Sequence, residues 1–263
     1  MIEYDVLGQI GLDNCVAARV CTGTANHHLL LDAGGDCLQQ LRRPQVYATI
    51  GVLFSHFHFD HYAGFDELLR AVWNRNGPLL QVIGPPGTCQ VLQHRLQGYL
   101  WNNAPGQPGG FRVSEFDGQT LQTIRLLTTE KFEIAHAEPV VETSSLVWEH
   151  DDFAVHAIQL DHGTPSIGYR IQEPDSVSVQ ENQLAEMGLR RGPWLKTLKD
   201  SRFPDTDTVN VDGIPYELGQ LRQSLLLKKR GTSLGYLTDF RADDQAVRHQ
   251  LRQVFFRTRC ADL

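Results

Sequence analysis

Short stretches of this chain alternate between apolar and polar residues, and turn-forming residues such as Gly, Pro and Asp separate many of them. A period of two predicts β-strands, because successive side chains of a strand point to opposite faces. We expect strands at residues 1–7, 16–20, 28–31, 50–54, 79–83, 121–127, 132–136, 145–149, 153–160, 224–228 and 233–237. Helices are expected at residues 37–41, from the end of the segment 55–61 through about residue 73, at 88–100 and at 243–256. Strands and helices alternate in the first half, which indicates an α/β fold.

The pattern changes between about residues 172 and 225. Two short helical pieces, at residues 181–187 and 194–199, are set among Pro, Asp, Thr and Gly residues. This composition is typical of an excursion from a main body. We therefore expect residues 1–263 to form one main domain with an insertion at 172–225.

Composition supports a folded protein and restricts where nucleic acid could bind. The 263 residues are 41% hydrophobic and 21% charged, close to the average of globular proteins and unlike disordered or coiled-coil chains. The formal net charge is −7, so no global positive field attracts nucleic acid. Any surface that binds RNA must therefore be local.

Cysteine usage and the start of the chain indicate a cytoplasmic protein. The five cysteines are scattered and form no C-x-x-C pair, which argues against a disulfide framework and a structural zinc knuckle. The segment at residues 1–5 has acids where a signal peptide would be basic, and no apolar run approaches the ~18 residues of a membrane span. We expect reduced thiols, no export and no membrane insertion.

Residues 56–61 read His-Phe-His-Phe-Asp-His and follow an expected buried strand. Neutral imidazole nitrogen and carboxylate oxygen are zinc ligands, and the same ligands accept manganese or iron. In strand geometry His56 and His58 point to one face, so both can bind one ion, while Asp60 and His61 can bind a second. Two ions about 3.5–4 Å apart could activate a water and stabilise the leaving oxygen of a phosphodiester. The alternative is a His-rich loop that packs for other reasons.

This motif, preceded by the apolar strand at 51–55, resembles the metal loop of the metallo-β-lactamase superfamily. The resemblance implies a four-layer αββα sandwich. Further segments are similar to the ribonuclease Z family, whose members trim the 3′ trailer from precursor tRNA: Gly-Pro-Pro-Gly at 84–87, His162 with 166–170, and 185–189 leading to 192–196. The similarity spans residues 8–239.

The resemblance implies six metal ligands: His56, His58, Asp60, His61, His162 and Asp239. His56, His58 and His162 would bind one zinc ion, Asp60 and His61 the other, and Asp239 would bridge the two. The alternatives are a structural histidine at 162, paired with its acidic neighbour, and a solvated strand-end acid at 239.

Two further acids have implied roles. Asp60 would also be the general base that takes a proton from the attacking water. Asp32 corresponds to an acid that faces the site, and we expect it to support the ligands without binding metal itself. The other histidines have no ligand-like spacing, and we interpret them as surface or packing residues: His27, His28, His94, His136, His150, His156 and His249.

The insertion resembles the arm with which ribonuclease Z grips tRNA. The implied substrate-binding residues are Arg190, Arg191, Gly192, Pro193, Lys196 and Lys199. Their charges would supply the local positive surface that the whole chain lacks, and phosphate contacts would make binding depend on salt. The alternative is a solvated basic loop held to the body by Trp194.

The family pattern continues beyond the bridging acid through an H-S-T-like segment and a final T-H-x-S-like strand end, and the sequence contains neither. We therefore expect the C-terminal part of the second half to be missing. Either the chain is truncated, or another subunit completes it. Exposed sheet edges favour a homodimer.

The leading hypothesis is a zinc-dependent endoribonuclease of the ribonuclease Z type, acting on precursor tRNA. Two alternatives stay open: a catalytically incomplete RNA-binding subunit and a small-molecule hydrolase of the same superfamily. A small substrate would not need a remote basic loop for binding, which argues against the small-molecule hydrolase.

Overall fold

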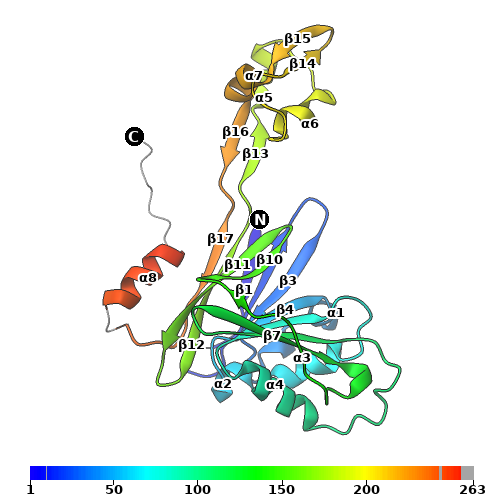
Figure 1. Cartoon of the computed structure of the whole chain (residues 1–263), viewed down its shortest axis with the longest axis vertical. Coiled ribbons are helices and arrows are strands. Elements are labelled where there is room, and N and C mark those ends of the chain that lie inside the picture. Colours follow the sequence, from blue (N-terminus) through cyan, green and yellow to red (C-terminus); the bar gives the residue numbers. More distant parts are fainter. Residues whose placement is uncertain (10, 243–244, 256–263) are drawn as a thin grey trace. The chain divides into compact units, whose positions relative to one another are not determined.

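The computed structural model describes residues 1–9, 11–242 and 245–255 (Figure 1). The chain forms two compact units. The first contains residues 1–173 and the chain from Thr232 onward, and the second contains residues 174–231.

Within the described residues, nine strands form the first sheet of the first unit. They are β1 (Ile2–Val6), β2 (Val16–Cys21), β3 (Asn26–Leu31), β4 (Thr49–Leu53), β5 (Leu80–Gly84), β6 (Gly110–Phe116), β7 (Thr120–Leu127), β8 (His136–Ala137) and β9 (Val141–Glu142). Strands β1 to β8 lie in sequence order, and β9 also pairs with β7. The central strands β3 to β6 are parallel, whereas the outer pairs are antiparallel.

Helices cover one face of this sheet. They are α1 (Arg43–Tyr47), α2 (Phe59–Tyr62), α3 (Phe65–Val72) and α4 (Thr88–Gln97), with 3₁₀ turns η1 (Cys37–Gln40) and η2 (Thr128–Glu130). Two consecutive residues of β4 show how the sheet is shared between two cores: Val52 belongs to the core with Phe65 and Leu68 of α3, and Leu53 belongs to the core on the opposite face. Apolar side chains are therefore buried on both faces of the parallel strands.

The second sheet packs on the other face of the first. It consists of the antiparallel strands β10 (Leu146–His150), β11 (Phe153–Asp161), β12 (Pro165–Gln172) and β17 (Ser233–Tyr236). Val155, Ile167 and Tyr169 of this sheet share a core with Leu53 and Ile83 of the first. At Gly51, the absence of a side chain leaves room for the ring of Trp148, which a Cβ would approach to 2.5 Å.

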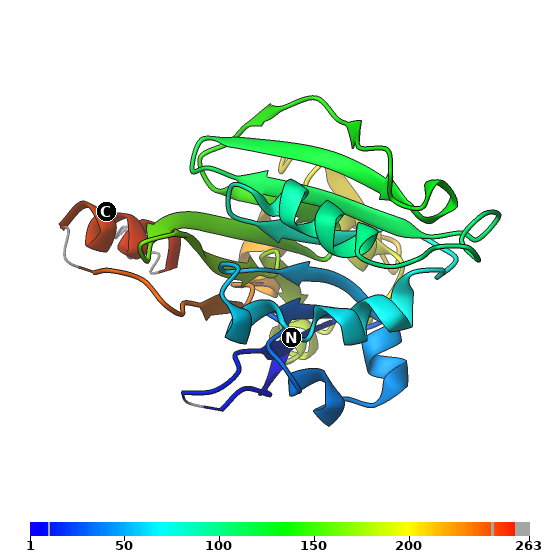
Figure 2. The same cartoon turned by 90° about the horizontal axis from the view of Figure 1, so that it is seen from below.

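A helix forms the fourth layer. Helix α8 (Gln245–Phe255) contacts β11, and Figure 2 shows it in red next to the strands of the second sheet. Phe255 lies against Gly168, on the side of the sheet that Ile158 also faces. The neighbouring residues Ile167 and Tyr169 face the core between the sheets. Phe255 therefore covers the outer face, and the expected four-layer αββα arrangement is confirmed.

The second unit, which lies between β12 and β17 in the chain, has a core of its own. It contains two strand pairs and three helices: β13 (Ser176–Val179) with β16 (Leu226–Lys229), β14 (Thr208–Val211) with β15 (Ile214–Glu217), α5 (Glu181–Glu186), α6 (Trp194–Lys199) and α7 (Leu218–Leu225). Leu184, Trp194, Leu198 and Leu221 are buried together. The sequence predicts an insertion at 172–225, and the second unit spans residues 174–231.

Several elements differ from the sequence prediction. The helix expected up to residue 73 is divided at Gly64, where a Cβ would lie 2.5–3.0 Å from the carbonyl oxygens of residues 33–35. The strand expected at 132–136 is reduced to β8, because Phe132 has a φ of 61°, outside the strand region. The strand expected at 224–228 begins only at Leu226, where α7 has ended.

Several observed helices and strands have no counterpart in the sequence prediction. The pattern does not predict α1, β6, β9, β12 or most of the strands of the second unit. The helix expected at 243–256 corresponds to α8, whereas residues 243, 244 and 256 lie outside the described residues. No helix among the described residues has the length and apolar character needed to cross a membrane.

Tyr169 joins the two sheets. Its side chain is fully buried, and its hydroxyl donates to the carbonyl oxygen of Phe54 at 2.8 Å and lies 3.2 Å from that of Ile83. Residues 52–54 and 83 lead directly into the loops at the carboxyl ends of β4 and β5. This hydroxyl therefore fixes the second sheet against the strand ends that precede the histidine loop.

The variant Tyr169→Phe is expected to lower the free energy of unfolding by about 1–3 kcal/mol, because a buried carbonyl loses its donor. Urea unfolding followed by circular dichroism measures the change. Tyr4→Phe is the control, since Tyr4 is 59% exposed and its hydroxyl should matter by less than about 0.5 kcal/mol. Equal stabilities of the two variants would contradict this account of the inter-sheet contact.

Candidate metal centre

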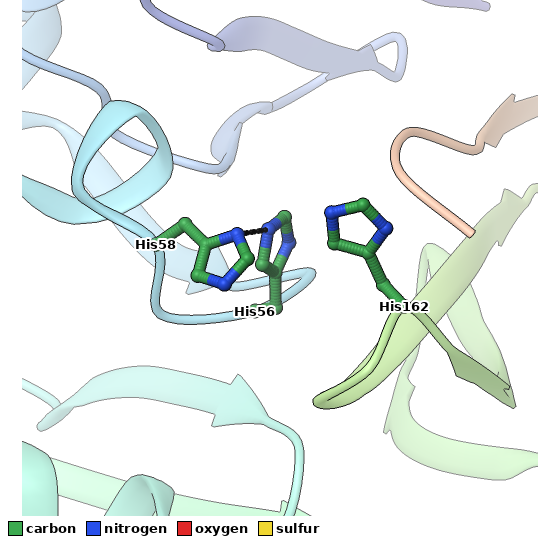
Figure 3. Close-up of side chains that lie close together, drawn as sticks. All are labelled: His56, His58 and His162. Atoms are coloured by element: carbon green, nitrogen blue, oxygen red, sulfur yellow. Dashed lines mark hydrogen bonds between the residues drawn. The ribbon is translucent and has the colours of Figure 1, made fainter.

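Three histidines converge where the two sheets meet. His56 lies in the loop after β4, His58 precedes α2, and His162 lies in the turn between β11 and β12. His56 Nε2 is 3.0 Å from His58 Nδ1, and the ring of His162 is centred 5.3 Å from both other rings (Figure 3). Each residue offers a nitrogen within 4.8 Å of the others. His56 is fully buried, so the protein closes the group on the side of this residue. The opposite side of the group is open to solvent.

A second group shares His56 with the first. His56, His61 and Asp239 each offer a ligand atom within 4.8 Å of the others. His61 is a buried residue of α2, and Asp239 follows β17. The Asp239 Oδ2 atom is 3.2 Å from His61 Nε2 and 3.9 Å from both His56 Nε2 and His162 Nε2. One carboxylate oxygen thus lies beside both groups, as a bridging ligand would.

Asp60 stands at the edge of the centre and belongs to neither group. Its Oδ2 atom is 3.4 Å from His61 Nε2, and its side chain is 44% exposed. The side-chain amide of Asn14 donates to the same oxygen at 3.1 Å and also lies 3.1 Å from His61 Nε2. Asn14 therefore orients a carboxylate that is open to solvent.

Asp32 supports the centre from below. This fully buried residue follows β3 with a φ of 59°, a conformation that is uncommon for residues other than Gly. Its carboxylate accepts from the amide and hydroxyl of Ser55, both at 2.6 Å, and from the hydroxyl of Tyr236 at 2.8 Å. Its Oδ2 atom is also 2.6 Å from His61 Nδ1. A proton held on Nδ1 leaves the lone pair of His61 on Nε2, which faces Asp239.

The electrostatic environment separates the two neighbouring histidines. Burial, together with the nearby His61 and His58, lowers the pKa of His56 to about 4. His56 is therefore neutral at pH 7 and has a lone pair for a metal. Burial also opposes the charging of His61, but the hydrogen bond and charge of Asp32 and the charges of Asp60 and Asp239 prevail and raise its pKa. The surrounding acids thus favour positive charge at this position.

The donor set fits a divalent metal. Imidazole nitrogens and carboxylate oxygens are the ligands of zinc, and they also accept manganese or iron. The structure brings together five of the six expected ligands in the two groups and leaves Asp60 beside them. Asp32 lies where the sequence places it, next to the ligands but outside both groups.

Sequence reasoning missed three residues of this centre. Asn14, Ser55 and Tyr236 each contact an acid or histidine of the site. Ser55 could have been noticed, because it directly precedes His56 at the end of an apolar strand. Asn14 and Tyr236 carry no local signal, since their roles depend on chain segments that meet only in the folded structure.

A third collection of ligand-type side chains lies elsewhere in the first unit. His27, His150 and Asp152 offer atoms within 4.8 Å of one another. His27 Nε2 is 2.6 Å from Asp152 Oδ2, and the backbone N–H of Asp152 donates to His150 Nδ1 at 3.1 Å. The acceptor role of Nδ1 places the proton of neutral His150 on Nε2. Their own hydrogen bonds thus occupy these groups, and we assign no metal to them.

The six expected substrate-binding residues all lie in the second unit: Arg190, Arg191, Gly192, Pro193, Lys196 and Lys199. The four cationic side chains are exposed. Arg191 pairs with Glu181, whereas Lys196 and Lys199, on α6, show no ion pair within the described residues. The indole N–H of Trp194 donates to the carbonyl of Arg190 at 3.1 Å, and its ring packs beside Gly192.

Comparison with known proteins identifies the family of this chain. A model of the beta-lactamase superfamily domain matches residues 27–189. Ribonuclease Z of Deinococcus radiodurans is 38% identical over 244 residues, which cover 93% of this chain and 72% of the relative. Ribonuclease Z of Pyrococcus horikoshii is 25% identical over 229 residues, covering 85% of this chain and 62% of the relative.

Among solved structures, the short form of human tRNase Z aligns with 66% of this chain and 64% of its own, with 16% identity and a TM-score of 0.39. This chain therefore spans only part of the length of these relatives. The superfamily match covers more than half of the chain, and the similarity to ribonuclease Z of Deinococcus radiodurans extends over nearly all of the chain. The resemblance seen in the sequence is confirmed: the chain belongs to the beta-lactamase superfamily and, within it, to the ribonuclease Z family.

Proposed function

We propose that this chain is a zinc-dependent endoribonuclease that removes the 3′ trailer of precursor tRNA by hydrolysis. The observation that carries the proposal is the convergence of five ligand-type side chains, from both sheets, beside the exposed carboxylate of Asp60. Relatives that match over most of the chain are named ribonuclease Z, which supports RNA as the substrate.

His56, His58 and His162 would hold one ion, and His61 and Asp60 the other, with Asp239 shared between them. Zinc is the ion that we propose, with manganese and iron as alternatives that the same ligands accept. Bound there, two divalent ions would polarise a phosphodiester oxygen and make water more acidic. The buried wall formed by His56, His61 and Asp32 fixes the geometry of the ligands before substrate arrives.

Asp60 is the proposed general base. Its exposed carboxylate can reach an incoming water, and Asn14 holds one of its oxygens at 3.1 Å. The other oxygen is then free to take the proton as the water attacks phosphorus. A positioned base of this kind contributes about 10²–10⁴-fold to a rate.

The second unit is the proposed contact for the body of the tRNA. Residues 174–231 carry nine Lys and Arg against eight Asp and Glu, whereas the rest of the chain carries 15 against 23. The second unit is therefore the part of an acidic chain where phosphate is least repelled. We propose that Arg190, Lys196 and Lys199 contact phosphate groups, and that Gly192 and Pro193 shape the loop between them. Arg191 would have to leave Glu181 to do the same.

Other readings give different experimental results. An incomplete RNA-binding subunit would bind precursor tRNA in a salt-dependent way and leave it uncut. A small-molecule hydrolase would cleave a simple phosphodiester or an ester and would not bind tRNA. Assembly as a homodimer stays a prediction, which sedimentation of the purified protein tests.

Metal content tests the first step. Elemental analysis of the purified chain is expected to give close to two ions, and His58→Ala is expected to lose at least one, because it removes a donor from the three-histidine group. His94→Ala is the matched control, since His94 is exposed on α4 and should leave metal content unchanged. A wild-type chain without bound metal would contradict the proposal.

The variant Asp60→Asn is expected to lower kcat for precursor-tRNA cleavage by about 10²–10⁴-fold, because the amide can neither accept the proton nor bind the second ion as a carboxylate does. Trailer release resolved on a gel measures the rate, and filter binding measures affinity for the same RNA. Affinity should stay within about threefold of wild type, since the second unit is unchanged. A variant with wild-type kcat would remove Asp60 from the mechanism.

Combined replacement of Lys196 and Lys199 by Ala is expected to weaken tRNA binding and to flatten its salt dependence by roughly one unit of slope per lost phosphate contact. Binding measured at several salt concentrations gives the slope. Arg43→Ala, an exposed cation on α1 of the first unit, is the control and should change neither value. An unchanged slope in the double variant would exclude these lysines from the RNA contact.

A further inference from the structure

Two tyrosines lie opposite each other on neighbouring strands of the second sheet. Tyr169 of β12 and Tyr236 of β17 are paired in the antiparallel register, and both side chains face the first sheet. The hydroxyl of Tyr169 reaches backbone carbonyls, those of Phe54 and Ile83. The hydroxyl of Tyr236 reaches a charged side chain instead, the carboxylate of Asp32, at 2.8 Å. Two similar residues therefore make different kinds of contact between the sheets.

The contact of Tyr236 is made to the oxygen that orients His61. Asp32 Oδ2 accepts from Tyr236 and from the hydroxyl of Ser55, and it lies 2.6 Å from His61 Nδ1. The carboxylate is fully buried, so no solvent can replace a lost donor. Without the tyrosine hydroxyl, the position of this oxygen would depend on Ser55 and His61 alone.

The strand that carries Tyr236 also delivers Asp239. Asp239 lies three positions after Tyr236, and its Oδ2 atom lies 3.2 Å from His61 Nε2. The contacts therefore form a closed path from Tyr236 to Asp32, to His61, to Asp239 and back along the chain. Such a path fixes the spacing between a ligand of the first sheet and a ligand that follows the second.

We propose that Tyr236 is a positioning residue that sets the distance between His61 and Asp239 and so determines affinity for the second metal ion. The inference rests on one part of the proposed function, the binding of two metal ions. It does not depend on RNA as the substrate. Partners that orient metal ligands in this way typically change affinity by 10–100-fold when they are removed. Tyr236→Phe is therefore expected to raise the Kd of the second ion by about 10–100-fold and to leave the first ion bound.

The experiment compares Tyr236→Phe with Tyr169→Phe. Each variant loses one hydroxyl that forms a hydrogen bond between the sheets, so each is expected to lose stability toward urea. Metal-free protein is titrated with Zn²⁺ against a chelating dye, which gives the Kd of each ion. Titration with Co²⁺ adds the visible absorption of the bound ion, which reports the geometry of its ligands. Only Tyr236→Phe should weaken the second ion and change its Co²⁺ spectrum.

The outcomes are distinct. A Tyr236→Phe variant with a wild-type second Kd and Co²⁺ spectrum would overturn the inference and leave the proposed function standing. Equal weakening by Tyr169→Phe would also overturn it, because the effect would then be a general loss of packing. A wild-type chain that binds no second ion would overturn the inference together with the two-metal part of the proposed function.

Discussion

The buried carboxylate of Asp32 is the interaction on which the candidate site depends. An isolated charge in a protein interior costs several kcal/mol, and it is tolerated only where hydrogen-bond donors surround it. Ser55, His61 and Tyr236 supply these donors from the loop after β4, from α2 and from β17. None of these elements can shift without removing a donor from the charge. The left-handed backbone of Asp32, which aims the carboxylate at them, is held in place by the same contacts.

This arrangement also explains why two adjacent histidines have opposite electrostatic properties. The rings of His56 and His61 are 4.1 Å apart, yet the pKa of His56 is lowered and that of His61 is raised. His56 is buried beside other imidazoles, which disfavour its protonation, whereas His61 lies between carboxylates. The carboxylates around His61 therefore favour positive charge at this position. A cation bound beside Asp60 and Asp239 would meet the same preference.

The sequence predicts well those features that local pattern encodes. His56 and His58 are identifiable because they alternate at the end of an apolar strand. Asp239 is identified by the resemblance to the family, and its place after an apolar strand agrees with that role. His162 is identifiable only by resemblance, since a single histidine in a turn has no pattern of its own. Tyr236 is not identifiable, because its contact with Asp32 joins positions that are 204 residues apart. The division of the helix at Gly64 is likewise set by the tertiary approach of residues 33–35.

The second unit is inserted in the sequence of the first, between β12 and β17, and this has a consequence for folding. Its two chain ends leave an antiparallel strand pair, where Gln172 lies opposite Ser233 and the N–H of Glu173 donates to the carbonyl of Thr232 at 2.9 Å. In topological terms, the unit is the enlarged loop of a β-hairpin. The entropy of closing a loop grows only slowly with its length, by about 0.6 kcal/mol for each doubling. A change in the length of this loop therefore costs the pairing of β12 with β17 little free energy, so the strand that precedes Asp239 tolerates changes in the second unit.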